Sequence, residues 1–245
     1  MAGKTNHRPN YGIDAPGVIR NLMIAGAACA ALPLALPRLT VAHVELQLFP
    51  GLLYTGGALF LGGVLMLLYA RFGKFTHRDR MLAEVPWNGA ETVLDVGTGR
   101  GLLLIGAAKR LTTGHATGID IWNAEDLSGN GPEALLANIA LEGVGGNTTV
   151  KSEDARQMSF ANGSFDVVLS NLCIHNIYDR AGREKACIEI ARVLRCGGLA
   201  VISDYKHVAD YGKVLAGAGL VVTLHSRNWF TTYPPLRILV ARKTA

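Results

Sequence analysis

The nearly uncharged stretch over residues 22–70 limits the possible folds more than any other feature of this chain. Its charged side chains are only Arg38 and Glu45. Two apolar runs lie within or beside it, residues 18–37 and residues 46–70, and each is long enough for a helix that crosses a bilayer with some tilt. A short loop is expected between them. The sequence therefore predicts a transmembrane helical hairpin over residues 18–70.

Basic residues flank this region on both sides. They are Lys4, Arg8 and Arg20 ahead of it, and Arg71, Lys74, Arg78 and Arg80 behind it. Cytoplasmic flanks of membrane spans carry an excess of Lys and Arg, so both flanks are predicted on the cytoplasmic side. We expect a multi-pass membrane protein with two spans and a cytoplasmic tail of residues 1–17. The charge pattern indicates membrane lipids rather than nucleic acid as partner, because nucleic-acid binders spread basic residues over a folded face.

Two other interpretations of the apolar runs are open. A cleaved signal peptide also has a basic start and an apolar core, and Thr40–Ala42 loosely fits a cleavage site. Cleavage there would strand the second run. A soluble hairpin inside a large core is the other alternative, but the remaining chain is too small to cover it. Gly56–Gly57 and Gly62–Gly63 form a flat helix face, which permits a homo-oligomer.

From Thr92 onward, short β-rich runs alternate with helical runs. This alternation favours a doubly wound α/β fold with a parallel sheet. Residues 219–243 break the pattern with two strand-like runs and no helix between them, so an antiparallel pair is expected at one edge. We predict a domain over residues 89–245. Residues 71–88 are expected to form a juxtamembrane helix or linker at the cytoplasmic surface, with cations toward anionic headgroups.

The stretch "TVLDVGTGRG", residues 92–101, ends the first strand of this domain. Ligands of such sheets bind at the carboxyl ends of the strands. A dinucleotide fingerprint requires a third glycine where Leu102 stands, and the Gly-Lys-Ser/Thr ending of a phosphate loop is absent. The carboxylate of Asp95 would repel a pyrophosphate and attract an ammonium. The ligand is therefore expected to present a cationic amine here and a ribose near Asp120, which ends the second strand.

At these motifs the sequence resembles class I S-adenosylmethionine-dependent methyltransferases, over most of residues 74–245. The resemblance rests on "LDVGTGRG", on "GID", on "SEDARQMSFANGSFDVVLSN", and on "RVLRCGGLAVISD", the last being similar to ubiquinone/menaquinone methyltransferases. It implies a Rossmann-like seven-stranded sheet with an antiparallel last strand. It also implies S-adenosyl-L-methionine as cofactor and S-adenosyl-L-homocysteine as product.

The same resemblance implies the residues that bind the cofactor. The glycine-rich loop would hold the methionine moiety, Asp120 the ribose, Asp154 the adenine amino group, and Ile121 would pack on the adenine. The full predicted set is Asp95, Gly97, Thr98, Gly99, Gly101, Asp120, Ile121, Asp154, Ala155 and Asn171. The four cysteines show no CxxC pair or metal-ligand spacing, so no metal site is predicted.

His175, just past the fourth strand, is the candidate general base, because a histidine near neutral pKa suits proton removal from an acceptor. A histidine that only orients a loop is the alternative. The sequence "SNLC" differs from the Asn/Asp-Pro-Pro-aromatic motif of enzymes that methylate nucleic-acid or protein amines. We therefore expect a small lipophilic acceptor. Methylation of a lipid headgroup or membrane protein, and a non-catalytic S-adenosylmethionine sensor, stay as alternatives. The long connection over residues 122–131 either shapes the acceptor pocket or is a surface loop.

Overall fold

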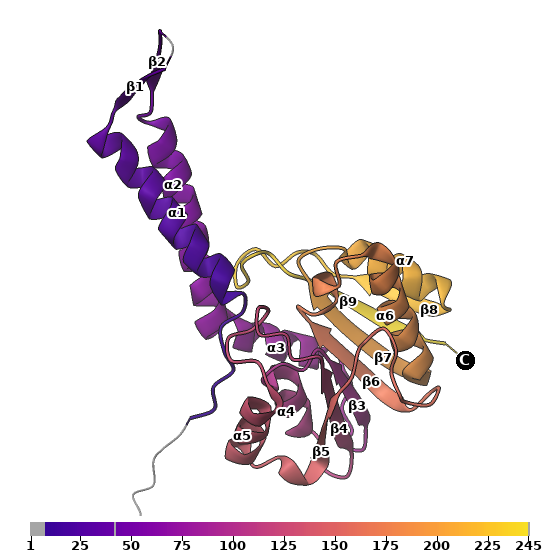
Figure 1. Ribbon diagram of the computed structural model, residues 1–245. Coiled ribbons are helices and arrows are strands. Elements are labelled where there is room, and N and C mark those ends of the chain that lie inside the picture. The colour runs from indigo at the N-terminus through magenta and orange to yellow at the C-terminus, as the bar shows by residue number, and fades with distance from the viewer. Residues whose placement is uncertain (1–7, 42, 245) are drawn as a thin grey trace, which may run out of the picture.

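Two long antiparallel helices form a stalk that projects from an α/β domain in the computed structural model, which describes residues 8–41 and 43–244 (Figure 1). The helices are α1, Pro16–Ala35, and α2, Gly51–Leu68. They pack at glycines, since a Cβ at Gly26 or at Gly56 would overlap the backbone of the opposite helix. Part of the predicted glycine face is thus used within the chain. Lys4 and Ala42 lie outside the described residues.

The connection at the tip of the stalk is a β-hairpin rather than the expected loop. Strands β1, Arg38–Val41, and β2, Val44–Gln47, pair antiparallel. Because β2 takes the first residues of the predicted second span, the helix begins at Gly51 instead of residue 46.

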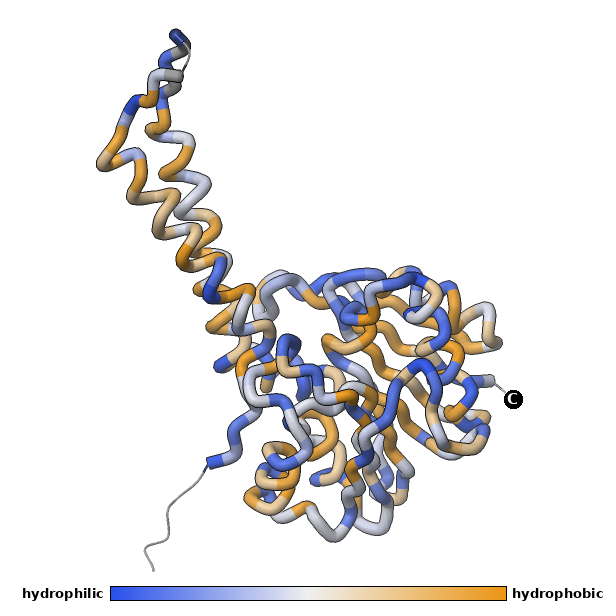
Figure 2. The backbone as a smooth tube through the Cα atoms, viewed as in Figure 1, coloured by the Kyte–Doolittle hydropathy of each residue, from blue (hydrophilic) through white to orange (hydrophobic). Residues whose placement is uncertain are grey.

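Both stalk helices are long and apolar enough to cross a membrane, judged by length and composition. Within each, 17% of the most apolar window is buried inside the protein. Figure 2 shows the apolar residues running along the stalk, away from the domain. Most of this apolar surface is therefore left without protein contacts.

The chain leaves α2 through a π-helical turn, η1 (Tyr69–Gly73), and continues as α3, Lys74–Ala83. The expectation that the cations of residues 71–88 face headgroups is wrong for Lys74, because one face of α3 packs into the domain. Met81 and Leu82 are fully buried in the domain core, and Lys74 is only 3% exposed. Of the four cations in residues 71–88, Lys74 points inward. Burial of one apolar stripe explains why this helix belongs to the domain.

The domain is built on a seven-stranded sheet in the order β5-β4-β3-β6-β7-β9-β8. Strand β9 runs antiparallel to both of its neighbours, and the other pairs are parallel. The predicted fold class and the antiparallel pairing at the C-terminal edge are confirmed. The strands are β3 (Thr92–Val96), β4 (His115–Asp120), β5 (Thr148–Ser152), β6 (Phe165–Asn171), β7 (Leu194–Asp204), β8 (Leu220–Leu224) and β9 (Arg237–Lys243).

Helices cover both faces of this sheet (Figure 1). On one face lie α3, α4 (Leu102–Ala108) and α5 (Pro132–Glu142). On the other lie α6 (Arg180–Val193) and α7 (Val208–Gly217), with short 3-10 turns η2 (Gly145–Asn147) and η3 (Ile174–Asn176) in the loops. Alternate strand residues enter opposite cores: Val93 joins the α3–α5 side and Leu94 the α6–α7 side. The carboxyl ends of β3, β4 and β6 are left facing the foot of the stalk.

Candidate functional site

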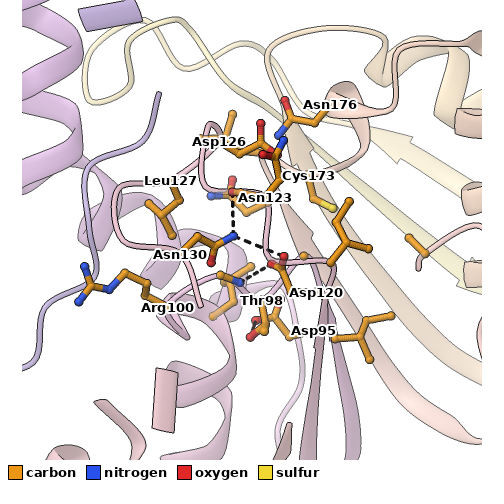
Figure 3. A pocket seen from close by; sticks show the side chains of 18 of the residues that line it. Asp95, Thr98, Arg100, Asp120, Asn123, Asp126, Leu127, Asn130, Cys173 and Asn176 are labelled. Carbon is orange, nitrogen blue, oxygen red and sulfur yellow. Dashed lines mark hydrogen bonds between the residues drawn. The ribbon is translucent and has the colours of Figure 1, made fainter. Parts of the chain in front are cut away.

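A cavity of about 350 Å³ opens where β3, β4 and β6 end, within the size range of small-molecule sites. Strand order reverses between β3 and β6, so this is the switch-point crevice expected of a doubly wound sheet. Most of the predicted cofactor residues line it: Asp95, Gly97, Thr98, Gly99, Asp120, Ile121, Asp154, Ala155 and Asn171. Gly101 and His175 do not appear among the described lining residues. Figure 3 shows Asp95, Thr98 and Asp120 together in the wall of this cavity.

The buried side chain of Asp95 holds the glycine-rich loop through two hydrogen bonds. Its Oδ2 accepts hydrogen bonds from Thr98 Oγ1 (2.8 Å) and from the backbone N–H of Leu104 (2.9 Å). Burial raises the pKa of Asp95 to about 7, although these two hydrogen bonds oppose the rise. With Oδ2 occupied, a ligand amine would approach Oδ1. A cation there would restore the charged carboxylate that burial disfavours.

Two glycines of the loop are required by packing as well as by backbone conformation. Gly97 has φ of +74°, and a Cβ on it would overlap the side chain of Cys173. Gly101 has φ of +87° and forms the cap of α4, where a Cβ would collide with Leu135. The position of Gly101 indicates a structural role, whereas Gly97 also borders the cavity.

Asp120 closes the second strand with both carboxylate oxygens in use. Oδ2 accepts from the backbone N–H of Gly99 (2.8 Å) and Oδ1 from that of Trp122 (2.7 Å). The side chain of Asn130 lies 3.5 Å from Oδ1 and donates to the carbonyl of Asn123 (Figure 3). Each carboxylate oxygen has a further lone pair, so ribose hydroxyls could donate there without displacing these contacts.

The predicted adenine residues, Ile121 and Asp154, follow the ends of the neighbouring strands β4 and β5. Ile121 is 65% exposed, so an apolar side chain is presented to a planar ligand at the rim. Asp154 forms an ion pair with Arg156, whose Nη2 is 2.6 Å from Oδ2. This partner lowers the pKa of Asp154 and keeps it ionised as an acceptor. An adenine amine would have to share that carboxylate with the guanidinium.

The long connection over residues 122–131 is a wall of the cavity, and it is paired with the segment ahead of α1. Backbone hydrogen bonds join Ala15 N–H to Asp126 O (2.9 Å) and Ser128 N–H to Ile13 O (3.0 Å). Asp126, Leu127 and Asn130 line the cavity from this loop. Residues 122–131 therefore line the cavity that holds the predicted cofactor residues, and their part in an acceptor pocket stays a prediction.

The segment of residues 10–14, which we call the strap, crosses the site and contributes Tyr11 and Asp14 to the cavity wall. Lys74 fixes it from α3: its Nζ donates to the carbonyls of Tyr11 (2.8 Å) and Gly12 (2.6 Å) and lies 3.7 Å from Asp14 Oδ2. Asn138 of α5 holds the strap's first residue through its amide. Burial raises the pKa of Asp14, and the ammonium of Lys74 opposes that rise.

Sequence reasoning missed Tyr11, Asp14 and Lys74, because the wall they build joins chain segments on both sides of the stalk. One signal was present: Asp14 is the only acidic residue ahead of Glu45. An isolated acid at the start of an otherwise basic, apolar region indicates a specific partner.

Buried acceptors on the cavity wall await a donor. Within the residues that the structure describes, no hydrogen-bond partner is present for Asn171 Oδ1 or Asn130 Oδ1. A buried acceptor without a donor costs about 1–3 kcal/mol, so a ligand that supplies N–H and O–H groups would bind well. S-adenosyl-L-methionine carries an ammonium, two ribose hydroxyls and an adenine amine, and so supplies donors for these acceptors.

His175 lies next to the cavity in η3, held by a buried carboxylate. Its Nδ1 is 2.8 Å from Asp204 Oδ1, and its backbone N–H donates to Asp204 Oδ2 (3.1 Å). Its ring packs edge-on against Tyr205, with centroids 4.8 Å apart. Asp204 is 1% exposed and His175 14% by side chain. The contact at Nδ1 is a close approach of the carboxylate rather than a hydrogen bond, so the backbone hydrogen bond to Asp204 is what holds His175 in place.

Comparisons with known proteins agree with this geometry. Residues 93–198 match the family model described as a methyltransferase domain. A ubiquinone/menaquinone biosynthesis C-methyltransferase, UbiE of Bdellovibrio bacteriovorus, is 34% identical over 127 residues, which are 51% of this chain and 49% of the relative. This chain thus spans about half the length of that curated relative.

Two solved structures show the same fold at low sequence identity. YcgJ of Bacillus subtilis aligns with a TM-score of 0.58 at 14% identity, over 69% of this chain and 99% of its own. The cyclase SpnF aligns with a TM-score of 0.59 at 16% identity, over 70% and 82%. The chain therefore carries a methyltransferase domain with the class I S-adenosylmethionine-dependent fold, similar to that of UbiE.

Proposed function

We propose that this protein is an integral-membrane S-adenosylmethionine-dependent methyltransferase that acts on a small lipophilic acceptor and releases S-adenosyl-L-homocysteine. One observation carries the proposal: the switch-point cavity is walled by carboxylates and by buried acceptors without donors. Such a wall suits a cationic ligand rich in hydrogen-bond donors and opposes a pyrophosphate.

The residues of the cavity divide the binding work between them. Asp120 would hold the ribose, Asp154 and Ile121 the adenine, and Asn171 with Asp95 the methionine ammonium. When bound, S-adenosyl-L-methionine supplies an electrophilic methyl group on a sulfonium. Displacement at that methyl needs an in-line approach in a site that excludes water, so the protein contributes chiefly by positioning.

The stalk supports a membrane location, with the domain on the cytoplasmic side. Its helices leave most of their apolar surface without protein contacts, unlike the core helices of a soluble protein. The strap enters α1 and α3 leaves α2 at the same end of the stalk, so both flanks lie on one side (Figure 1). Exposed Arg20 and Arg71 lie at that end, as the positive-inside rule requires of a cytoplasmic face.

A quinone-type ring is the acceptor class that the relative's name suggests. Methylation at an acidic ring carbon or a phenol removes a proton, and the pair of His175 and Asp204 is placed beside the cavity to accept it. We assign His175 as the base and Asp204 as the residue that holds it in place. Membrane anchoring would hold enzyme and lipophilic acceptor on one surface and raise their effective concentration.

The test is transfer of labelled methyl groups from S-adenosyl-L-methionine to lipids extracted from membranes that contain the full-length protein. Label is expected in a chloroform-soluble aromatic fraction, and Asp120→Ala should abolish it at limiting cofactor. Label in phospholipid or in protein would favour the alternative acceptors. Cofactor binding without transfer to any fraction would favour a sensor and refute the proposal.

A further inference from the structure

The loop between β8 and β9, residues 225–236, carries exposed aromatic side chains to the foot of the stalk (Figure 1). Phe230 is 98% exposed, Trp229 69% and Tyr233 37%. Large aromatic side chains in such positions are costly in water, and neighbouring ones mark a surface that another apolar phase covers. We call residues 225–236 the aromatic loop.

Its own hydrogen bonds hold the aromatic loop in this shape. Asn228 Oδ1 accepts from the backbone N–H groups of Phe230 (3.2 Å) and Thr231 (3.1 Å), and its Nδ2 donates to Thr231 Oγ1 (2.6 Å). Thr232 Oγ1 donates to the carbonyl of Asn228 (2.6 Å). These hydrogen bonds fix the shape of the turn. The side chains of Trp229 and Phe230 are left exposed to solvent.

Contacts with the stalk fix the height of the aromatic loop along α2. A Cβ at Gly62 would lie 3.3 Å from the Tyr233 hydroxyl oxygen, and one at Gly73 would overlap the carbonyl of Thr231. Gly62 precedes the last residue of α2, Leu68, by a distance of about 9 Å at 1.5 Å per residue. The side chain of Tyr233 thus reaches past the end of α2 alongside the helix, whereas Thr231 lies at the level of Gly73, on the domain side of that end.

The same height is marked independently on α1. A Cβ at Gly63 would lie 3.3 Å from the carbonyl oxygen of Ile19 and 3.4 Å from the backbone nitrogen of Met23. Arg20, the first charged residue of the stalk, lies in this turn and is exposed. An arginine at the end of a span snorkels to the headgroup level, and Trp and Tyr concentrate at that level. Tyr233 and Arg20 therefore lie at one depth.

The geometry points to the aromatic loop as a third membrane-contact element, which inserts Trp229 and Phe230 into the headgroup–acyl boundary of the cytoplasmic leaflet beside α2. This inference rests on the proposed membrane-spanning stalk. Exposed Arg71 in η1 and exposed Arg227 within the aromatic loop suit anionic headgroups. Three attachments, from α1, α2 and this loop, would set the orientation of the domain and hence of its cavity on the bilayer.

Depth-dependent quenching of tryptophan fluorescence tests this inference. The full-length protein is reconstituted into vesicles of phosphatidylcholine and phosphatidylglycerol, with lipids brominated near the headgroup or deep in the acyl chain. One version keeps only Trp229, through Trp87→Phe and Trp122→Phe. The matched control keeps only Trp87, which lies beyond the far end of α3, next to the amino end of β3. A third version, without native tryptophans, carries Phe60→Trp in the middle of α2.

Trp229 emission is expected to shift to shorter wavelength in vesicles and to lose more intensity to shallow than to deep bromines. Trp87 should be unaffected, and Phe60→Trp should be quenched most by deep bromines. Quenching of Phe60→Trp with Trp229 behaving as Trp87 does would overturn the inference and leave the membrane span intact. If Phe60→Trp is not quenched, the proposed membrane span fails, and the inference fails with it. Where Trp87→Phe impairs folding, the signal of Trp229 is taken as the difference between the parent and Trp229→Phe.

Discussion

Cofactor affinity should rise with pH through neutrality because of the buried carboxylate of Asp95. Burial raises its pKa to about 7, so the free protein holds Asp95 largely protonated at pH 6 and largely ionised at pH 8. If the methionine ammonium binds the ionised form, binding at the lower pH must first remove a proton. For a pKa of 7 that cost is about 1.4 kcal/mol at pH 6 and nearly zero at pH 8, or about tenfold in affinity.

Cofactor affinity is expected to rise with pH, whereas the stability of the free protein is expected to fall. Its folded-state pKa lies above the unfolded value of 3.8, so the contribution of Asp95 to stability is lost as pH rises through about 7. The melting temperature of the free protein should therefore fall from pH 6 to pH 8, while the increment produced by S-adenosyl-L-methionine should grow.

Isothermal calorimetry in buffers of different ionisation enthalpy measures both the affinity and the protons released. Asp95→Asn, which keeps an acceptor for Thr98 and Leu104, should flatten the pH dependence and abolish proton release. S-adenosyl-L-homocysteine, which carries the same amine, should reproduce the profile of the cofactor. A wild-type affinity independent of pH between 6 and 8, or an unchanged slope in Asp95→Asn, would refute the assignment of Asp95 to the ammonium.

Three further outcomes are expected. His175→Ala should lower turnover by on the order of a hundredfold with cofactor affinity nearly unchanged, whereas a parallel fall in affinity would make His175 a structural residue. Lys74→Met should weaken cofactor binding in calorimetry by about 1.5–3 kcal/mol, since it releases the strap, and Arg78→Met on the same helix should not. Equal losses in those two variants would mean that α3 is merely destabilised. Trp229→Ser combined with Phe230→Ser should slow methylation of a bilayer-embedded acceptor and spare a water-soluble analogue, and equal rates on both would separate the aromatic loop from turnover.

Local patterns in the sequence were sufficient for the sheet and for the core of the site. Strand-ending motifs such as "LDVGTGRG" and "GID" place Asp95 and Asp120 at adjacent strand ends, and parallel strands bring such ends to one edge whatever the rest of the chain does. The antiparallel edge also followed, because two strand-like runs without a helix between them can pair directly.

The features that sequence reasoning missed depend on contacts between distant segments. Nothing local distinguishes Lys74 from Arg78, yet Lys74 is buried under the strap and the side chain of Arg78, on the next turn, is 23% exposed. The β-hairpin over residues 38–47 was missed because its strands are short and weakly patterned. His175 was placed at the right strand end, but its partner Asp204 belongs to a different strand, so their 2.8 Å separation was not readable from spacing.

The strap and α3 connect the stalk to the cavity. The strap, which precedes α1, and α3, which follows α2, meet at the cavity. There Lys74 binds the carbonyls of Tyr11 and Gly12. A chain that starts near residue 71 would keep the sheet and the α6–α7 core, but it would lack Asn10, Asp14 and Tyr11, and Tyr11 belongs to the α3–α5 core. Such a truncation removes part of the cavity wall together with the stalk, because the strap that forms this wall leads directly into α1. Under the proposed function, membrane attachment and cofactor binding are therefore properties of one continuous structure, and point substitutions within the strap or the aromatic loop are needed to separate them.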